Sequence, residues 1–132
     1  MQVVSATPTH LDECRSWIER RGLPMPPTDV FSSTGFVAPG VAAVWLYLTG
    51  SSMAYMDHLI GNPDVSTETR SAGLDAVLSA AIAAARNANV RILLAMVDNP
   101  RVEARLLDHD LAVINRGLAY MSINLGEPSC PG

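Results

Sequence analysis

The sequence contains no lysine: its nine basic residues are all arginines, and they are scattered along the chain rather than clustered. A protein that binds nucleic acid normally carries a basic patch or stripe, whereas this chain has a formal net charge of −4. Nucleic acid is therefore not an expected partner. The lack of lysine also excludes a Schiff-base mechanism on a lysine of the protein itself.

Cysteines, aromatic residues and long apolar runs are also scarce. The two cysteines, Cys14 and Cys130, offer no metal-ligand spacing and no expected disulfide, so we expect no metal site and a reducing, cytoplasmic environment. No apolar run has the length of a membrane-spanning helix, and the N-terminus lacks the basic-then-apolar order of a secretion signal. The 132 residues predict a single domain over residues 1–125, followed by a flexible tail over residues 126–132.

The most organised stretch of the chain is residues 60–89, where a turn-rich loop leads into a long helix. From Leu74 onward, apolar residues recur at steps of three and four, which predicts one buried helical stripe. Before it, Ser66 is a capping residue, and the segment Arg70–Gly73 lies at the mouth of the helix. Unpaired backbone N–H groups and the helix dipole would favour a phosphate there, although an ordinary helix cap is the alternative.

The elements around this stretch predict a mixed α+β fold. An antiparallel meander runs into a central βαβ unit, which makes a mostly antiparallel sheet with flanking helices, and a small cofactor would sit where that sheet splays. The expected strands are residues 1–6, 34–38, 41–49, 53–60, 91–97, 112–114 and 118–125, and the other expected helices are residues 8–21 and 100–109.

These motifs resemble the GNAT superfamily of acyl-CoA-dependent N-acetyltransferases over roughly residues 1–125. The family's loop, an Arg or Gln, two residues, Gly, one residue, and Gly or Ala, is similar to the run from Arg70 to Asp75. The family's Asn that opens the last helix is similar to Asn99. The stretches DHLIGNPDVS and DNPRVEARLLDH also resemble small acetyltransferase-like proteins encoded by bacteriophages.

The resemblance implies transfer of an acetyl group from acetyl-CoA to an amine acceptor by direct attack. The acceptor would be a small molecule or a protein, with neither nucleic acid nor a membrane as partner, and a homodimer is compatible with this reading. The implied contacts to the cofactor come from the cradle of Arg70, Ser71, Ala72 and Gly73 around the pyrophosphate, from the backbone of Leu59 and Ile60 along the pantetheine arm, and from Asn99.

Asp57 and His58 stand late in the strand before the loop, where some family members hold a general base. Strand alternation predicts that only one of the two faces the cleft. A surface aspartate and a core histidine are the plainer interpretations.

Two departures favour a second hypothesis, a catalytically degenerate GNAT-fold module for binding or structure. Asp75 replaces the last small residue of the loop, where its carboxylate would repel a pyrophosphate unless it points away. Leu106 stands where many family members have a general-acid tyrosine.

Overall fold

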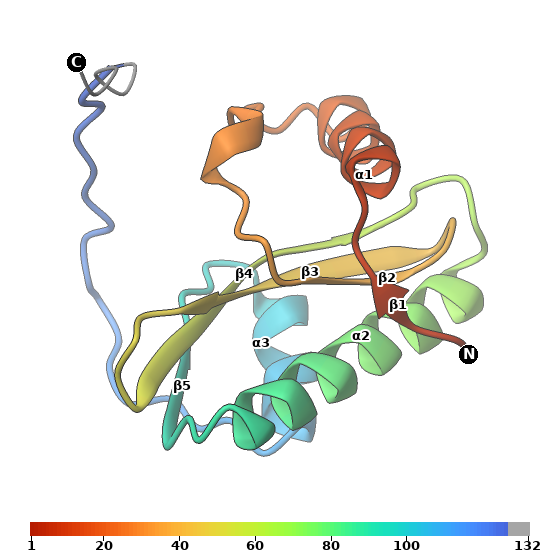
Figure 1. Ribbon diagram of the computed structural model, residues 1–132. Coiled ribbons are helices and arrows are strands. Elements are labelled where there is room, and N and C mark those ends of the chain that lie inside the picture. The colour runs from red at the N-terminus through yellow and green to blue at the C-terminus, as the bar shows by residue number, and fades with distance from the viewer. Residues whose placement is uncertain (127–132) are drawn as a thin grey trace.

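The protein is described by a computed structural model over residues 1–126, and it forms a five-stranded sheet with helices on both faces (Figure 1). The strands follow the chain order across the sheet, and every neighbouring pair is antiparallel except the last, β4 and β5, which are parallel. The predicted mixed, mostly antiparallel α+β sheet is confirmed. The strands are β1 (Val4–Ser5), β2 (Gly35–Ala38), β3 (Ala42–Leu48), β4 (Met53–Gly61) and β5 (Ile92–Ala95).

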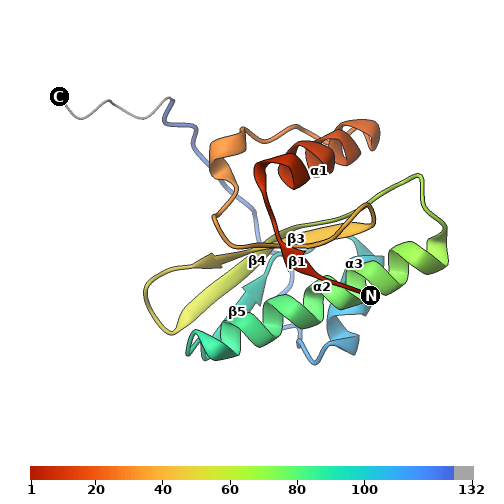
Figure 2. The same ribbon diagram turned by 45° about the vertical axis from the view of Figure 1, so that its right-hand side comes forward.

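Three α-helices and one 3₁₀ turn cover the sheet. α1 (Pro8–Arg20) and the turn η1 (Thr28–Val30) lie over one face, and α2 (Thr67–Asn87) with α3 (Pro100–Asp108) lies over the other (Figures 1 and 2). Each face therefore has its own apolar core. Trp17 and Trp45 are among the buried residues on the α1 face, while Leu46, Leu78 and Leu106 are among those on the α2 face.

The ends of α1 follow directly from its sequence. The Thr7 hydroxyl accepts a hydrogen bond from the His10 backbone N–H at 3.3 Å, the Thr7 N–H donates to His10 Nδ1 at 3.1 Å, and Pro8 occupies the first turn. These bonds satisfy amide groups that the start of a helix leaves unpaired. At the other end Gly22 adopts a left-handed φ of 69°, which glycine adopts without steric cost.

The segment after α3 differs from the prediction. Residues 112–114 and 118–125 were expected to be strands, but residues 112–126 form no strand and lead away from the sheet as an extended chain (Figures 1 and 2). The prediction of two strands is wrong. Alternating apolar residues give a segment one apolar face, but a strand also needs a neighbouring strand to pair with its backbone N–H and C=O groups. We call residues 112–126 the C-terminal arm.

The predicted flexible tail, residues 126–132, lies outside the described residues except for Gly126. Within residues 1–126, no helix has the length and apolar content that crossing a lipid bilayer requires.

Candidate functional site

The sheet opens at the carboxyl end of β4. β5 pairs with β4 only from Met53 to Met56, whereas β4 continues to Gly61 and stays paired with β3 on its other side. The last part of β4, residues 57–61, therefore has no parallel neighbour among the described residues. This opening lies directly before the loop that leads into α2, as expected from the order of the elements.

A β-bulge interrupts β4 at this opening. Trp45 pairs with Asp57 and Ala43 pairs with Ile60, so two residues of β4 oppose the single residue Val44 of β3. The bulged residue His58 has a left-handed φ of 57°, and its N–H donates to Asp57 Oδ1 at 2.7 Å. A non-glycine residue in this region costs about 1–3 kcal/mol and concentrates at functional sites.

The bulge brings Asp57 and His58 to the same face of the sheet. Asp57 lies opposite Trp45, whose side chain belongs to the core on the α1 face, and regular alternation would send the next residue to the α2 face. Instead, the His58 ring centroid lies 4.3 Å from that of Phe31 and 6.0 Å from that of Tyr47. The expectation that alternation separates the two residues is therefore wrong, because the left-handed residue breaks the alternation.

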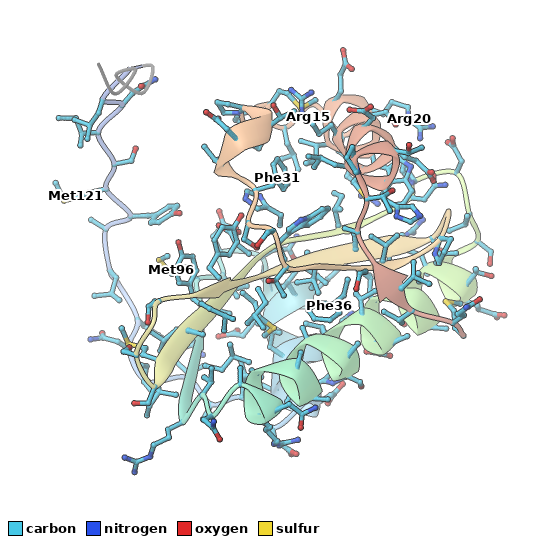
Figure 3. The ribbon with its side chains drawn as sticks, viewed as in Figure 1. Arg15, Arg20, Phe31, Phe36, Met96 and Met121 are labelled. Carbon is cyan, nitrogen blue, oxygen red and sulfur yellow. The ribbon has the colours of Figure 1, made fainter. Side chains whose placement is uncertain are left out.

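The ring of His58 lies within an aromatic wall on the α1 face, beside Phe31, which Figure 3 shows between η1 and the sheet. Burial lowers the pKa of His58 below its usual value, and the Asp57 carboxylate opposes that effect in part. A lowered pKa keeps the imidazole neutral near pH 7, with a ring nitrogen able to accept a proton.

Tyr47 extends the same wall. Its hydroxyl donates to the Val30 carbonyl at 3.1 Å, and its ring stacks on Tyr55 with the centroids 4.8 Å apart. Burial, with the Asp57 carboxylate as a second cause, raises the pKa of Tyr47. The phenol therefore stays protonated, with its proton already donated to a backbone oxygen.

α2 is capped by Ser66, as the sequence indicated, and the helix already includes Arg70–Gly73. Ser66 caps the helix by accepting a hydrogen bond from the Thr69 N–H at 3.1 Å, and the Arg70 N–H donates to the Ser66 carbonyl at 2.9 Å. The placement of Arg70–Gly73 in a loop with unpaired N–H groups is wrong, because these residues lie inside α2. Their role in cofactor binding stays a prediction that now depends on side chains, since the orphan amides of a helix lie in its first turn.

The glycines around this helix serve close packing. A Cβ on Gly73 would lie 2.4 Å from Val41 Cγ1, and a Cβ on Gly61 would lie 2.6 Å from the Arg70 side chain. No side chain fits at such separations, so Gly73 lets α2 approach the start of β3 closely. The presence of glycine at position 73 therefore has a structural explanation that involves no ligand.

Three arginines gather around the loop between β4 and α2. Arg21 donates to the Gly61 carbonyl through Nη2 at 2.9 Å, Arg20 pairs with Asp64, and Arg70 Nη1 donates to the Val65 carbonyl at 3.1 Å. Arg20 appears on α1 in Figure 3. Burial and the neighbouring Arg70 guanidinium lower the pKa of Arg21.

Sequence reasoning assigned no role to Arg20 or Arg21. The only available signal was their position as a basic pair at the end of a helix, and that pattern is common at helix C-termini.

Asp75 points toward α3, not toward the start of α2. Arg105 Nη1 donates to Asp75 Oδ1 at 2.8 Å and to the Ser71 hydroxyl at 3.2 Å, and His109 Nε2 lies 3.0 Å from the same carboxylate oxygen. Burial alone would raise the pKa of Asp75, but hydrogen bonds from His109 and Arg105 hold it below its usual value. The carboxylate is therefore neutralised by α3, and the Ser71 hydroxyl already has a partner.

The remaining predicted residues lie around the opening in structural roles. Asn99 caps α3 by accepting a hydrogen bond from the Arg101 N–H at 2.9 Å, and Leu106 is buried in the core on the α2 face. Leu59 packs against the α2 core, whereas Ile60 belongs to the α1 core. Their contacts with a cofactor stay predictions.

Two grooves lie outside this opening. One, of about 440 Å³, runs beside α1, and the other, of about 500 Å³, runs along β5. Neither is lined by residues 57–60 or 70–73. Across residues 1–126, no group of three or more His, Cys, Asp or Glu side chains is arranged to hold a metal ion.

No protein-family model matches the chain, and no curated protein sequence matches it either. Solved structures do. A candidate acetyltransferase of Agrobacterium tumefaciens has a TM-score of 0.71 and 17% identity over 92% of this chain and 100% of its own. An acetyltransferase of Trypanosoma brucei has a TM-score of 0.66 and 11% identity over 92% of this chain and 99% of its own.

The chain adopts the GNAT fold. A third GNAT-fold neighbour, a Mycobacterium tuberculosis protein solved in complex with CoA, has a TM-score of 0.65 and 13% identity over 80% of this chain and 70% of its own. At identities this low the likeness is one of fold, so the chemistry has to be argued from the residues described above.

Proposed function

We propose that the protein is an N-acetyltransferase that moves an acetyl group from acetyl-CoA to a primary amine, with His58 as the general base. The observation that carries this proposal is the strained His58 in the β-bulge, where β4 continues past β5. A glycine or asparagine would adopt that left-handed backbone with less strain, so the presence of a histidine there supports a role for its imidazole in addition to its contact with Phe31.

The residues present fit acetyl-CoA in part. The backbone of Leu59 and Ile60 lies in the segment of β4 that lacks a parallel neighbour, which suits hydrogen bonding to an extended pantetheine arm. The Ser66 hydroxyl and carbonyl already accept from the Thr69 and Arg70 N–H groups, so the first turn of α2 can offer a phosphate the amides of Thr67 and Glu68, with the Arg70 side chain beside them. The Asp75 carboxylate presents no repulsion, because it is paired with Arg105.

The bound cofactor would supply a reactive thioester, and the protein would supply the base and the binding surface. An acceptor ammonium approaching the α1 face would lose a proton to the neutral imidazole of His58. The free amine would then form a C–N bond at the thioester carbonyl as the C–S bond breaks, and CoA would leave as a thiolate, a tolerable leaving group that would take up the proton from the imidazolium directly or through water. Asp57 holds the bulge by accepting the His58 N–H and stabilises the imidazolium that forms. The rings of Phe31 and Tyr47 would limit the access of water to the imidazole during that proton transfer.

The test combines acetyl-CoA titration by calorimetry with turnover of a panel of primary amines. We expect His58→Asn to lower kcat by about a hundredfold, the usual scale for a general base, with little change in acetyl-CoA affinity. Asparagine is the matched replacement because it tolerates the left-handed backbone. Asp57→Asn is the comparison variant: it keeps an acceptor for the His58 N–H, and it should lower kcat less than His58→Asn does. Full turnover by His58→Asn would overturn the assignment of the base.

A second candidate is a GNAT-fold module without acetyl transfer. It is favoured by the helical hydrogen bond of the Arg70 N–H, which removes an amide from the expected pyrophosphate cradle, and by the core position of Leu106. If acetyl-CoA produces neither binding heat nor a rise in Tm, and no amine supports turnover, this candidate replaces the first.

A further inference from the structure

Most of the aromatic side chains of the protein gather on the α1 face of the sheet, beside His58. The sequence contains two Phe, two Trp and three Tyr, and apart from Phe36, on the α2 face, and Tyr120, in the C-terminal arm, all of them belong to this group. The group consists of Trp17, Phe31, Trp45, Tyr47 and Tyr55. The two tyrosines of the group are only half-buried, so it extends from the core to the surface next to the proposed base.

Tyr47 and Tyr55 form the exposed part of this group, and we call them the tyrosine pair. The two residues are direct partners across β3 and β4, and their rings stack with the centroids 4.8 Å apart and the planes 7° from parallel. The ring centroid of His58 lies 6.0 Å from that of Tyr47. Met96, which is 61% exposed, follows β5 and lies on the same side of the sheet in Figure 3. The base therefore borders an apolar surface that is rich in aromatic rings and partly open to solvent.

The charge beside the tyrosine pair is negative. The Asp57 carboxylate opposes the lowering of the His58 pKa and contributes to the raised pKa of Tyr47, so its field reaches both groups. No arginine has such an effect on either residue, and Asp57 takes part in no ion pair among residues 1–126. A molecule that binds here therefore gains from a positive charge and loses from a negative one.

We propose that the acceptor is a primary amine joined by a short alkyl chain to an aromatic ring, with no carboxylate group. This inference deepens the N-acetyltransferase activity proposed above and rests on it. The ammonium group of such a molecule lies between Asp57 and the imidazole of His58, and its ring packs against the tyrosine pair. Since the rings of His58 and Tyr47 are 6.0 Å apart, a chain of a few bonds spans the distance from the base to the pair.

The tyrosine pair favours an aromatic ring over an alkyl group of similar size. Aromatic rings that stack or meet edge to face gain binding energy beyond that of the buried area, whereas an alkyl group gains only from the area. The single carboxylate disfavours two other classes of amine. An α-amino acid would place its own carboxylate near Asp57, where no described arginine offsets it, and a polyamine would find one anionic partner for two or more charges.

The first test compares kcat/KM for matched amines at saturating acetyl-CoA. We expect 2-phenylethylamine to exceed 2-cyclohexylethylamine by about threefold to tenfold, because the second amine is the first with a saturated ring. We expect it to exceed L-phenylalanine by about tenfold or more, with L-phenylalaninamide, which has the bulk of the amino acid without its negative charge, closer to 2-phenylethylamine. Equal values for the two ring types, equal values for the amine and the amino acid, or a preference for spermidine would overturn the inference while the proposed activity stands.

The second test changes the tyrosine pair. Tyr55→Leu removes one of its rings and keeps an apolar side chain, so the preference for 2-phenylethylamine over 2-cyclohexylethylamine should fall to about one. Phe36→Leu is the matched control, since that ring packs on the α2 face, and it should keep the preference. A Tyr55→Leu protein that retains the preference of the parent protein contradicts the inference.

A binding measurement separates failure of the inference from failure of the proposed activity. If no amine supports turnover, the proposed activity fails, and ligand-observed NMR then reports whether 2-phenylethylamine binds to the full chain in the presence and absence of CoA. Binding that Tyr55→Leu weakens and Phe36→Leu leaves intact supports a site for aromatic amines. No binding to the parent protein overturns that site as well.

Discussion

Gly73→Ala tests whether this glycine serves helix packing, as the structure indicates, or a phosphate loop. The new Cβ would lie 2.4 Å from Val41 Cγ1 and 3.2 Å from Ala42 Cβ, so α2 or the start of β3 has to move. Such overpacking costs about 1–3 kcal/mol, and the better helix propensity of alanine returns up to about 1 kcal/mol. We therefore expect a net loss of about 1–2 kcal/mol in the free energy of unfolding.

The measurement is urea unfolding followed by circular dichroism, with an unchanged m-value as evidence that only stability has changed. The corresponding fall in Tm is about 3–5 °C for each kcal/mol in a domain of this size. Ala72→Gly, at the exposed neighbouring position, is the control and should cost about 1 kcal/mol through propensity alone. A Gly73→Ala protein that is as stable as the parent, yet binds acetyl-CoA more weakly, would refute the packing explanation.

Three further outcomes follow from the site. Acetyl-CoA at a hundredfold excess over its Kd should stabilise the fold by about 2.7 kcal/mol, read as a rise in Tm. Asp75→Asn should remove the ion pair with Arg105 and cost about 0.5–1 kcal/mol, because the carboxylate is half exposed. Since the pKa of Asp75 is lowered, this stability is present above about pH 4 and is lost as the pH falls, so acid unfolding curves of parent and variant should converge. The pKa of His58 is lowered in the folded protein. As the pH falls through about 6.5, the unfolded chain therefore binds a proton at this histidine before the folded chain does, which favours unfolding. Unfolding measured across that range should show falling stability in the parent protein and a flatter profile in His58→Asn.

The helices were predictable because their signals are local. The Thr7 cap and the proline at the first helical position define the start of α1, and Asn99 with Pro100 does the same for α3. For α2 the capping signal of Ser66 was recognised, and Ser66 is the observed N-cap. Arg70–Gly73 were nevertheless placed at the mouth of the helix, because the residues before Leu74 carry no apolar periodicity.

The arrangement of the candidate site could be predicted only in part. The sequence placed Asp57 and His58 at the carboxyl end of the strand before α2, which is where they lie. It did not predict the bulge, because the extra residue depends on the register between β3 and β4, which the apolar pattern of neither strand specifies. Nor did it predict the pairing of Asp75 with Arg105 and His109, since that contact depends on how α3 packs against α2.

The error at the C-terminal arm has a different origin. The alternation of Met121, Ile123 and Leu125 with polar residues is a property of the chain alone, and it correctly identifies a segment suited to a sheet. Strand formation also requires partners for the backbone N–H and C=O groups, and within residues 1–126 no strand pairs with the arm, which leads away from the body in Figure 1. Alternation along the chain is therefore necessary but not sufficient to predict a strand, because it indicates which face each side chain takes and not which backbone the segment pairs with.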